Sequence, residues 1–535
     1  MLRIQELRLA LDHQDDELRP AIVNRLGIAD TELLSFSIHR RGYDARNKRL
    51  ITFIYTLDVE LCNEQAVLQR LRDDAQIGPT PDMQYRPVAR APRRLAVRPV
   101  VIGTGPCGLF AGLILAQMGF RPIMLERGKP VRERTRDTFG LWRQGRLDPE
   151  SNVQFGEGGA GTFSDGKLHS QIKDPRHYGR KVLTEFIQAG APPEILYASK
   201  PHIGTFRLVA MVERMRASIE ALGGEFRFQS RMDDVLIEQG AVQGVILAGG
   251  EYIATTHVVL AVGHSARDTF YRLHERGVYF EAKPFSIGFR IEHPQSLIDR
   301  ARFGDYAGHP RLGAADYKLV HHCQNGRSVY SFCMCPGGTV VAATSEVGRV
   351  VTNGMSQYSR NERNANSGIV VGVTPADYPG HPLAGIAFQR YWEERAFLLG
   401  GGGYLAPGQR VGDFLAGRPS TALGMVLPSY TPGVHLTDLA TALPDYAIAA
   451  LREAIPAFDK KIKGFAMDDA VLTAVESRTS SPVRISRDDT LQSVNTRGLY
   501  PAGEGAGYAG GILSAAIDGI RAAEAVALSM VGDNG

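Results

Sequence analysis

The chain has 535 residues, which is too long for one ordinary hydrophobic core and indicates about two to four domains. With 44% hydrophobic and 22% charged residues it is not a disordered chain, and five cysteines are too few for a disulfide scaffold. The net charge of +4 is small for this length. No run approaches the roughly 18 apolar residues of a membrane span, and charged residues interrupt the N-terminus before a signal-peptide core develops. We therefore expect a cytoplasmic protein with reduced thiols and no membrane span.

Residues 1–85 predict a small α+β appendage of βαββ type. A strand, a helix and a hairpin turning near Gly42 to Asn47 are indicated by LRIQELRLAL, ELRPAIVNRLG and LLSFSIHRRGYDARNKRLITFIYTLDVEL. Small βαββ units bind nucleic acid in some proteins, but this one lacks an aromatic pair at an obvious stacking spacing, so we expect no nucleic-acid partner. We favour a module for packing, or one through which the chain forms an oligomer.

A basic, proline-containing stretch separates this appendage from the remainder of the chain. It reads RPVARAPRRLAVRP (86–99). Proline-rich segments are extended and solvated, so we expect a linker over residues 86–96, although its charge would also suit an acidic partner.

The strongest motif is VRPVVIGTGPCGLFAGLILAQMGFRPIMLERG (97–128), which predicts a strand, a glycine turn, a helix and a second strand. Gly103 permits the tight turn, Gly105 lets backbone amides approach a pyrophosphate, and Gly108 lets the helix pack against the strand. Pro106 suits the first helical turn, whose free amides and positive dipole end favour phosphates. This order predicts a dinucleotide site rather than a turn that serves only packing.

Three further residues of this motif are candidates for cofactor binding. Glu126 ends the second strand about 20 residues after Gly103, where its carboxylate can accept hydrogen bonds from a ribose diol. Arg127 follows it directly. Cys107 lies inside the glycine turn and is expected to be a small, partly buried residue; the alternative is a reactive thiol, because a helix N-terminus lowers a thiol pKa.

Two later segments complete a recognisable order of elements. They are THVVLAVGHSA (256–266) and GLYPAGEGAGYAGGILSAAIDGIRAAEAVAL (498–527), each a strand followed by a small-residue turn. This order resembles the two-dinucleotide-binding-domain flavoproteins of the glutathione-reductase type. The resemblance implies that Gly103, Gly105, Gly108 and Glu126 serve the pyrophosphate side of FAD, that Met232 offers its backbone to adenine, that Ala261 and Gly263 form the middle turn, and that Gly503 and Glu504 bind the ribityl chain before the helix entry at Gly511 and Ile512.

More narrowly, the chain resembles a family of bacterial FAD-dependent dehydrogenases over nearly everything after residue 95. The resemblance is carried by GEGGAGTFSDGKLHSQIKD (156–174), KPFSIGFRIEHP (283–294), SFCMCPGGTVVAATSEVGRVVTNGMSQYSRNERNANSG (331–368) and ESRTSSPVRI (476–485). It implies FAD, an oxidoreductase activity and a substrate-side domain inserted between the FAD-binding segments. The expected fold is α/β, with a Rossmann-like FAD-binding domain in two parts, 97–280 and 481–535, and an inserted α+β domain over 281–480.

The loop 156–167 is rich in glycine, as expected where backbone approaches a cofactor. Gly159, Gly161 and Thr162 are its candidate cofactor-binding residues, against the alternative of a mobile surface loop. Lys167 would compensate phosphate or flavin charge, although a solvated lysine is the commoner outcome.

The stretch SFCMCPGG places Cys333 and Cys335 one residue apart, and three interpretations stay open. Zinc, with Cys323 and His321 or His322 as further ligands, is disfavoured because common zinc knuckles space their cysteines more widely, so we expect no metal. A redox disulfide would join alternate strand residues about 6.6 Å apart and would be strained and reducible. We favour a buried hairpin, VYSFCMCPGGTVVAAT, whose cysteines are small packing groups; this does not exclude one thiol as proton donor to substrate.

The sequence thus predicts an FAD-dependent dehydrogenase that transfers a hydride between flavin N5 and an unidentified small substrate. The alternatives are a thiol-disulfide flavoenzyme using Cys333 and Cys335, and a non-catalytic FAD-stabilised protein that binds a partner through residues 1–85. A second complete dinucleotide motif is missing from the sequence, so we expect a transient NAD(P)H or other electron donor rather than a dedicated NAD(P)H domain. The charge of a reduced flavin is expected to face the helix opening at AGGILSAA and Arg478, whose alternative partner is Glu476 or another acid.

Overall fold

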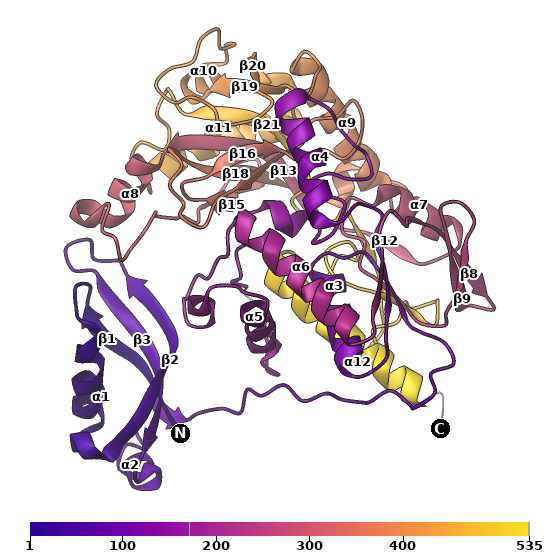
Figure 1. Ribbon diagram of the computed structural model, residues 1–535. Helices are drawn as coiled ribbons and strands as arrows, with labels where there is room; N and C mark the ends of the chain where they lie inside the picture. The colour runs from indigo at the N-terminus through magenta and orange to yellow at the C-terminus, as the bar shows by residue number, and fades with distance from the viewer. Residues whose placement is uncertain (171, 533–535) are drawn as a thin grey trace.

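The computed structural model describes residues 1–170 and 172–532, so one position of the 156–174 motif and the last three residues lie outside it. Figure 1 shows an N-terminal unit, a central unit that includes the C-terminal helix, and an inserted unit built from the middle of the chain. No described helix combines the length and the apolar character needed to cross a membrane.

The N-terminal unit is a four-stranded antiparallel sheet in the order β2-β3-β1-β4. Along its central strand β3 the residues Phe53, Tyr55, Leu57, Val59 and Leu61 are buried, which is the alternation of a strand with one face on a core. The predicted βαββ arrangement is confirmed, and α2 and the edge strand β4 are additions that the sequence pattern did not predict. The elements are β1 (Leu2–Ala10), α1 (Leu18–Leu26), β2 (Leu33–Asp44), β3 (Thr52–Leu61), α2 (Glu64–Arg70) and β4 (Ile77–Pro79).

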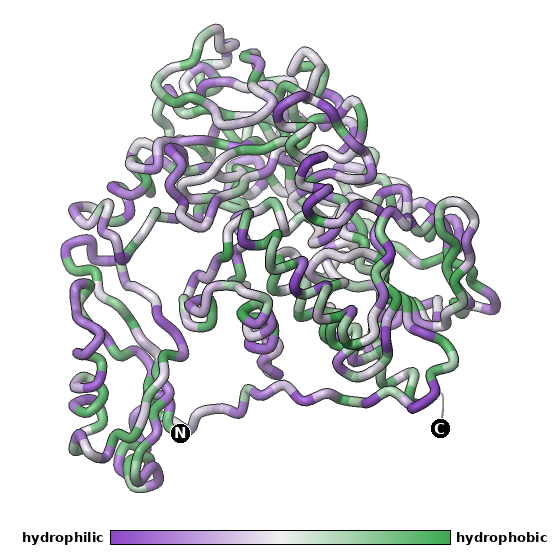
Figure 2. Tube along the Cα trace, viewed as in Figure 1, coloured by the Kyte–Doolittle hydropathy of each residue, from purple (hydrophilic) through white to green (hydrophobic). Residues whose placement is uncertain are grey.

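Residues 80–99 form neither helix nor strand and run along the central unit, as an extended trace with hydrophilic residues over much of its length (Figures 1 and 2). The Ala91 N–H donates to the Met118 carbonyl oxygen at 2.8 Å, and the rings of Tyr85 and Tyr178 lie 6.2 Å apart. The linker is therefore attached to the central unit at several points.

The central unit is built on a five-stranded parallel sheet in the order β23-β11-β5-β6-β7, so strands from distant parts of the sequence lie side by side. Alternate residues serve two cores: Val101 and Met124 face one, and Val100 and Leu125 face the other. Burial on both faces explains why these strands are continuously apolar. The strands are β5 (Val100–Ile102), β6 (Ile123–Leu125), β7 (Glu225–Arg227), β11 (Val258–Leu260) and β23 (Leu499–Pro501).

Different elements cover the two faces of this sheet. Helices pack on one face, and a three-stranded antiparallel meander with a short helix packs on the other. This is the doubly covered parallel sheet of a Rossmann-like domain, and the predicted fold class is confirmed. The first face carries α3 (Pro106–Gln117), α5 (Tyr178–Gln188), α6 (Thr205–Ala221) and α12 (Ile512–Gly532), and the second carries β8 (Met232–Glu238), β9 (Ala241–Leu247), β10 (Tyr252–Ala254) and α7 (Arg267–Glu275).

The inserted unit is a seven-stranded sheet in the order β14-β15-β18-β13-β21-β19-β20, with a separate β16-β17 pair. The chain enters and leaves it beside the paired strands β12 (Phe280–Ala282) and β22 (Val483–Ile485). The strands are β13 (Phe285–Pro294), β14 (Val320–His322), β15 (Ser328–Cys335), β16 (Thr339–Ala342), β17 (Thr352–Met355), β18 (Asn364–Val373), β19 (Ala406–Arg410), β20 (Val434–Leu436) and β21 (Val471–Glu476). Its helices are α8 (Gln295–Phe303), α9 (Ala384–Leu399), α10 (Val411–Ala416) and α11 (Asp445–Asp459), and α4 (Val131–Gln144) of the central unit contacts β16.

The predicted hairpin around the two cysteines is wrong. β15 pairs with β14 and β18, whereas β16 pairs with β17. Neighbouring strands in sequence favour a hairpin, but non-local packing selected other partners here. The consequence is that Cys333 and Cys335 end a strand of the large sheet instead of facing β16.

Candidate cofactor-binding and active site

A cavity of about 380 Å³ opens where the carboxyl ends of the parallel strands meet the inserted unit. This is the position at which open α/β sheets bind their ligands. The predicted residues that line it are Gly103, Gly105, Pro106, Cys107, Glu126, Arg127, Gly159, Gly161, Lys167, Met232, Ala261, Gly263, Cys333, Arg478, Gly503, Glu504, Gly511 and Ile512. Gly108, Thr162 and Cys335 are not among the lining residues and lie behind them.

The glycine turn after β5 is sterically closed to larger residues. Gly103 has a φ of 93°, and a Cβ there would lie 2.4 Å from the Ala261 carbonyl oxygen. A Cβ on Gly108 would lie 1.8 Å from the carbonyl oxygen of Gly103. The first glycine therefore allows the turn, and the second allows α3 to pack against it, as predicted.

Two helices begin at the cavity. Gly105 is the N-cap of α3 and Pro106 its first residue, while α12 begins at Ile512 directly after Gly511. Each helix N-terminus carries unpaired amides and a partial positive charge, which favour an anion. The cavity thus offers two separated electropositive ends, which suits a long ligand with more than one negative or polar group.

Glu126 is fixed in place by four donors. One carboxylate oxygen accepts from the Thr104 amide at 3.0 Å and the Thr104 hydroxyl at 2.7 Å, and the other accepts from the amides of Gly128 and Gly156, both at 2.9 Å. The carboxylate lines the cavity, as predicted, but it also joins the glycine turn to the loop after residue 150. A ribose diol would meet an acceptor that is already oriented.

Arg127 and Met232 also line the cavity. The Arg127 guanidinium pairs with Glu150 and Asp268, both at 2.9 Å, and lies 4.0 Å over the ring of Phe155. Its charge is therefore balanced by protein carboxylates, and what it presents to the cavity is mainly a planar surface.

Arg134, which the sequence analysis did not single out, organises the glycine-rich loop. The side chain is fully buried, and burial lowers its pKa to about 10. Thr162 lies beside it, with its hydroxyl oxygen 3.5 Å from Nη1, so Thr162 supports the loop from behind the cavity wall. The guanidinium donates, at 2.7 to 2.9 Å, to the backbone carbonyl oxygens of Asn152, Val153, Glu157 and Gly159.

The turn after β11 meets the turn after β23 where His264 lies beside Glu504. His264 is the second site residue that the sequence did not predict. Its Nδ1 lies 3.4 Å from Oε1 of Glu504, and both residues line the cavity. Its Nε2 is buried and has no hydrogen-bond partner among the described residues. An unsatisfied buried ring nitrogen at a cavity wall is suited to a polar ligand atom. The small-residue turn was predicted, but nothing in its sequence marked the histidine.

Cys107 is buried at the cavity wall. Burial, with a contribution from the nearby Asp518 carboxylate, raises the pKa of its thiol well above the ordinary value. Desolvation therefore disfavours the alternative of a reactive thiol at the helix N-terminus, and the packing role stays a prediction. Asp518 has its own role, since it accepts from the Gly503 amide at 2.7 Å and pairs with Arg487 at 2.6 Å, which holds the turn after β23.

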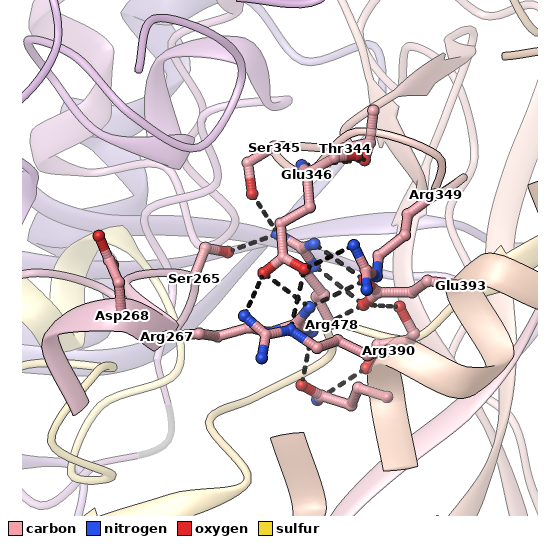
Figure 3. Close-up of polar contacts among 12 residues, drawn as sticks. Ser265, Arg267, Asp268, Thr344, Ser345, Glu346, Arg349, Arg390, Glu393 and Arg478 are labelled. Carbon is pink, nitrogen blue, oxygen red and sulfur yellow. Dashed lines mark hydrogen bonds and ion pairs between the residues drawn. The ribbon is translucent and has the colours of Figure 1, made fainter. Parts of the chain in front are cut away.

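Arg478 pairs with Glu393 and not with Glu476, so of the two alternatives named from the sequence the structure has another acid, and that acid is buried. Figure 3 shows that the guanidinium groups of Arg478 and Arg267 are both directed at the Glu393 carboxylate. Arg478 binds its two oxygens at 3.0 Å each, and Arg267 binds them at 2.7 and 2.9 Å. Burial alone would raise the pKa of Glu393, but the two arginines hold it well below the ordinary range. Arg478 also donates to the hydroxyls of Ser265 and Ser345.

Glu476 belongs to another buried ion pair, with Arg290. Nε and Nη2 of Arg290 donate to its two oxygens at 2.7 and 3.0 Å. Nη1 of the same guanidinium donates to the Cys333 carbonyl oxygen at 2.9 Å. Arg290 therefore connects β13, β21 and the cysteine-bearing end of β15.

Cys333 faces the cavity, while Cys335 is fully buried behind it. The thiol of Cys335 donates to the Cys333 carbonyl oxygen at 3.3 Å. A hydrogen bond from Cys335, with the charges of Lys167 and Arg290, holds the pKa of the Cys333 thiol well below its ordinary value against the effect of burial. Lys167 donates to the Met334 carbonyl oxygen and is placed beside the thiols, so it is not a freely solvated lysine.

Of the ligands weighed for zinc, the structure brings Cys323 and His321 together. Cys323 lies with His321 and Glu453 near α11, where one ligand atom from each falls within 4.8 Å of the others. The Nδ1 atom of His322 instead lies 2.8 Å from the Ser328 hydroxyl. The absence of a metal site stays a prediction for this chain.

The chain has clear relatives. An "uncharacterized protein" of Clostridium beijerinckii is 48% identical over 525 residues, which is 98% of each chain. Residues 284–479 match the description "FAD-dependent protein, C-terminal domain-like", and residues 1–60 match a domain of unknown function.

Solved structures are similar at low identity. A flavoprotein/dehydrogenase from Cytophaga hutchinsonii is 11% identical over 82% of this chain and 79% of its own, with a TM-score of 0.36. The E. coli quinol fumarate reductase FrdA is 12% identical over 82% of this chain and 71% of its own, with a TM-score of 0.35. The family assignment depends on the relative and the matched domain. The chain belongs to the family of FAD-dependent proteins that carry this C-terminal domain.

Proposed function

We propose that this protein binds FAD in the cavity and is an FAD-dependent dehydrogenase acting on a small substrate. One observation carries the proposal: the two helix N-termini, the glycine turn and the Glu126 carboxylate converge on a single cavity whose remaining wall comes from the inserted unit. Bound FAD would supply a flavin ring that accepts or donates a hydride.

The residues of the cavity fit the parts of FAD in a consistent order. The pyrophosphate would lie at the amides that begin α3, and the ribose at Glu126, with adenine beside Met232 and Arg127. Glu504, with His264 beside it, would bind the ribityl chain, and the N-terminus of α12 would face the edge of the ring that becomes negative on reduction. The buried, unpaired Nε2 of His264 supports a polar ligand at this position.

The inserted unit would provide the substrate side. Phe332, Cys333, Thr352, Asn353 and Glu476 line the cavity from strands β15, β17 and β21. They would exclude water from the flavin face and position a small polar molecule. Because Arg478 is committed to Glu393, its charge would act on the flavin only together with that of Glu393 and Arg267.

An equilibrium titration of apoprotein with FAD, followed by flavin fluorescence, tests the binding step. We expect one FAD per chain and weaker binding of FMN, because FMN lacks the adenosine half that the Glu126 end of the cavity would hold. Equal affinities for FAD and FMN, or no saturable binding, would contradict the placement.

An anaerobic screen of metabolites for bleaching of the flavin tests catalysis. A dehydrogenase should be reduced rapidly by one class of compound, whereas a protein that uses FAD only for stability should be bleached by none. Stopped-flow mixing with NADH and NADPH tests the electron donor: reduction that saturates at micromolar cofactor would contradict a purely transient donor.

A further inference from the structure

The CMC motif combines one thiol that reaches the cavity with one that does not. Cys333 lines the cavity, Cys335 is fully buried, and the Cys335 thiol donates to the backbone carbonyl oxygen of Cys333 at 3.3 Å. Between them, Met334 packs into the hydrophobic core, so the segment cannot easily rotate. An exposed thiol backed by a buried neighbour is the arrangement of an attacking and a resolving cysteine.

The backbone at Cys333 is held in a demanding conformation. Its φ is 44°, in the left-handed region that non-glycine residues rarely occupy, and among the residues lining the cavity it is the one described non-glycine residue with a positive φ. The pairing of β15 with β18 shifts register between Phe332 and Cys335, so the cysteine lies in a β-bulge. Strained residues and bulges cluster at functional sites, where they direct a side chain.

Two cations donate hydrogen bonds to backbone carbonyl oxygens of this bulge. Nη1 of Arg290 donates to the Cys333 carbonyl oxygen, and the Lys167 ammonium donates to that of Met334. Both positive charges lower the pKa of the Cys333 thiol, whereas burial raises the pKa of the Cys107 and Cys323 thiols. A pair of cysteines that served packing alone would need neither cation.

We propose that Cys333 and Cys335 are a redox-active dithiol that exchanges two electrons with the bound cofactor and with a small thiol or disulfide compound. In the oxidising direction both S–H bonds break, one Cys333–Cys335 bond forms, and two electrons and two protons pass to FAD or reduce a disulfide R–S–S–R to two R–SH. A small compound would exchange at Cys333, since of the two cysteines of this pair it is Cys333 that lines the cavity. The exchange with FAD rests on the proposed function; the disulfide itself does not.

The apoprotein tests the dithiol without any flavin. It would be equilibrated in dithiothreitol buffers of graded potential, alkylated with N-ethylmaleimide in denaturant so that buried thiols also react, and analysed by mass spectrometry. We expect the wild type to lose two of its five alkylatable thiols reversibly, with the loss mapped to the peptide carrying Cys333 and Cys335. Cys335→Ser should lose none, while the controls Cys62→Ser and Cys323→Ser should still lose two.

All thiols remaining alkylatable across the whole potential range would overturn the proposal, as would loss mapped to other cysteines. If Cys335→Ser fails to fold, the proposal is still tested, because the thiols that the wild type loses are sufficient to decide it.

Reductive titration of the FAD-loaded protein under anaerobic conditions tests the exchange with FAD. After mild oxidation, the wild type should take up twice as many electrons per flavin as Cys335→Ser, one pair for the disulfide and one for the flavin. Equal uptake in the two proteins would overturn the exchange. A protein that binds no FAD would instead contradict the proposed function and leave the thiol mapping intact.

Discussion

Arg134 shows how one buried side chain can shape a binding site that it does not line. Its guanidinium donates hydrogen bonds to four backbone carbonyl oxygens of the loop 152–159. Within this loop, Gly159 approaches the helix N-cap so closely that a Cβ on it would lie 2.7 Å from the Cα of Gly105. The loop and the glycine turn therefore form one surface only while Arg134 holds the carbonyl groups.

Arg134→Met should weaken FAD binding by at least about ten-fold, because buried carbonyl groups lose charge-assisted hydrogen bonds and the loop relaxes away from the turn. The control is Arg132→Met. Arg132 lies on the same helix as Arg134, and its replacement removes only a surface ion pair with Glu213 of α6. Fluorescence titration with FAD measures both variants, and equal affinities would show that the loop keeps its shape without Arg134.

Lys167 should set the reactivity of Cys333. Its positive charge favours the thiolate, so Lys167→Met should raise the pKa of the Cys333 thiol and slow its alkylation at pH 7 by about ten-fold, the effect of one pKa unit. The pH profile of iodoacetamide labelling in the apoprotein measures this. Lys200→Met, which removes a lysine paired with Asp316, is the matched control and should leave the profile unchanged.

Helices α3 and α12 pack so closely that small residues are required between them. A Cβ on Gly519 would lie 2.1 Å from the carbonyl oxygen of Cys107, so the two helix backbones are nearly in contact. Because both helices begin at the cavity, their spacing fixes the distance between its two electropositive ends.

Gly519→Ala should lower the thermal midpoint of the protein and release FAD, because neither backbone can move without displacing a helix N-terminus. Gly140→Ala is the control on α4, where the nearest atom would be 3.7 Å from the new Cβ. That change should be neutral or stabilising by up to about 1 kcal/mol. Differential scanning fluorimetry with and without FAD compares them; a Gly519→Ala protein as stable as Gly140→Ala would show that the helices adjust.

Elements encoded locally were predictable, and those that depend on distant partners were not. The strand, glycine turn and helix around Gly103 follow from residue types at fixed spacing, and the structure has them there. The partner of Arg478 is 85 residues away on α9, so the sequence allowed Glu476 or another acid and could not say which acid it would be. The sequence did not predict the roles of Arg134, His264 and Arg290 for the same reason. No local pattern shows that a polar or charged side chain will be buried.

At the scale of the whole molecule, the N-terminal unit is fastened to the rest by backbone and side-chain hydrogen bonds. The Arg41 amide donates to the Tyr197 carbonyl oxygen at 2.6 Å, and the Ser199 amide donates to the Arg41 carbonyl oxygen at 2.8 Å. Nε2 of His309 lies 2.8 Å from Oδ1 of Asp12. Figure 1 shows the unit beside the central and inserted units, with the linker running from its lower end beneath the central unit. An oligomer through residues 1–85 stays a proposal.

The inserted unit should make the protein acid-sensitive through His293. This side chain is fully buried against Phe465, and burial lowers its pKa to about 4. Because the folded pKa is below the unfolded value, its contribution to the free energy of unfolding is present above about pH 6.5 and is lost as pH falls toward 4. The loss from this group alone should be about 2 kcal/mol between pH 7 and pH 5.

Urea unfolding of wild type and His293→Gln at pH 7 and pH 5, followed by near-ultraviolet circular dichroism, measures this contribution. The glutamine variant keeps a donor for Phe465 but cannot gain a proton, so its midpoint should fall less on acidification. Parallel falls in the two proteins would assign the acid sensitivity to other groups.

A crystal structure of the protein with FAD would test the placement of the cofactor. We expect the pyrophosphate at the amides that begin α3, adenine toward Met232, and the flavin ring between the N-terminus of α12 and Cys333. Flavin density outside this cavity, or the reversed orientation with adenine beside Cys333, would contradict it.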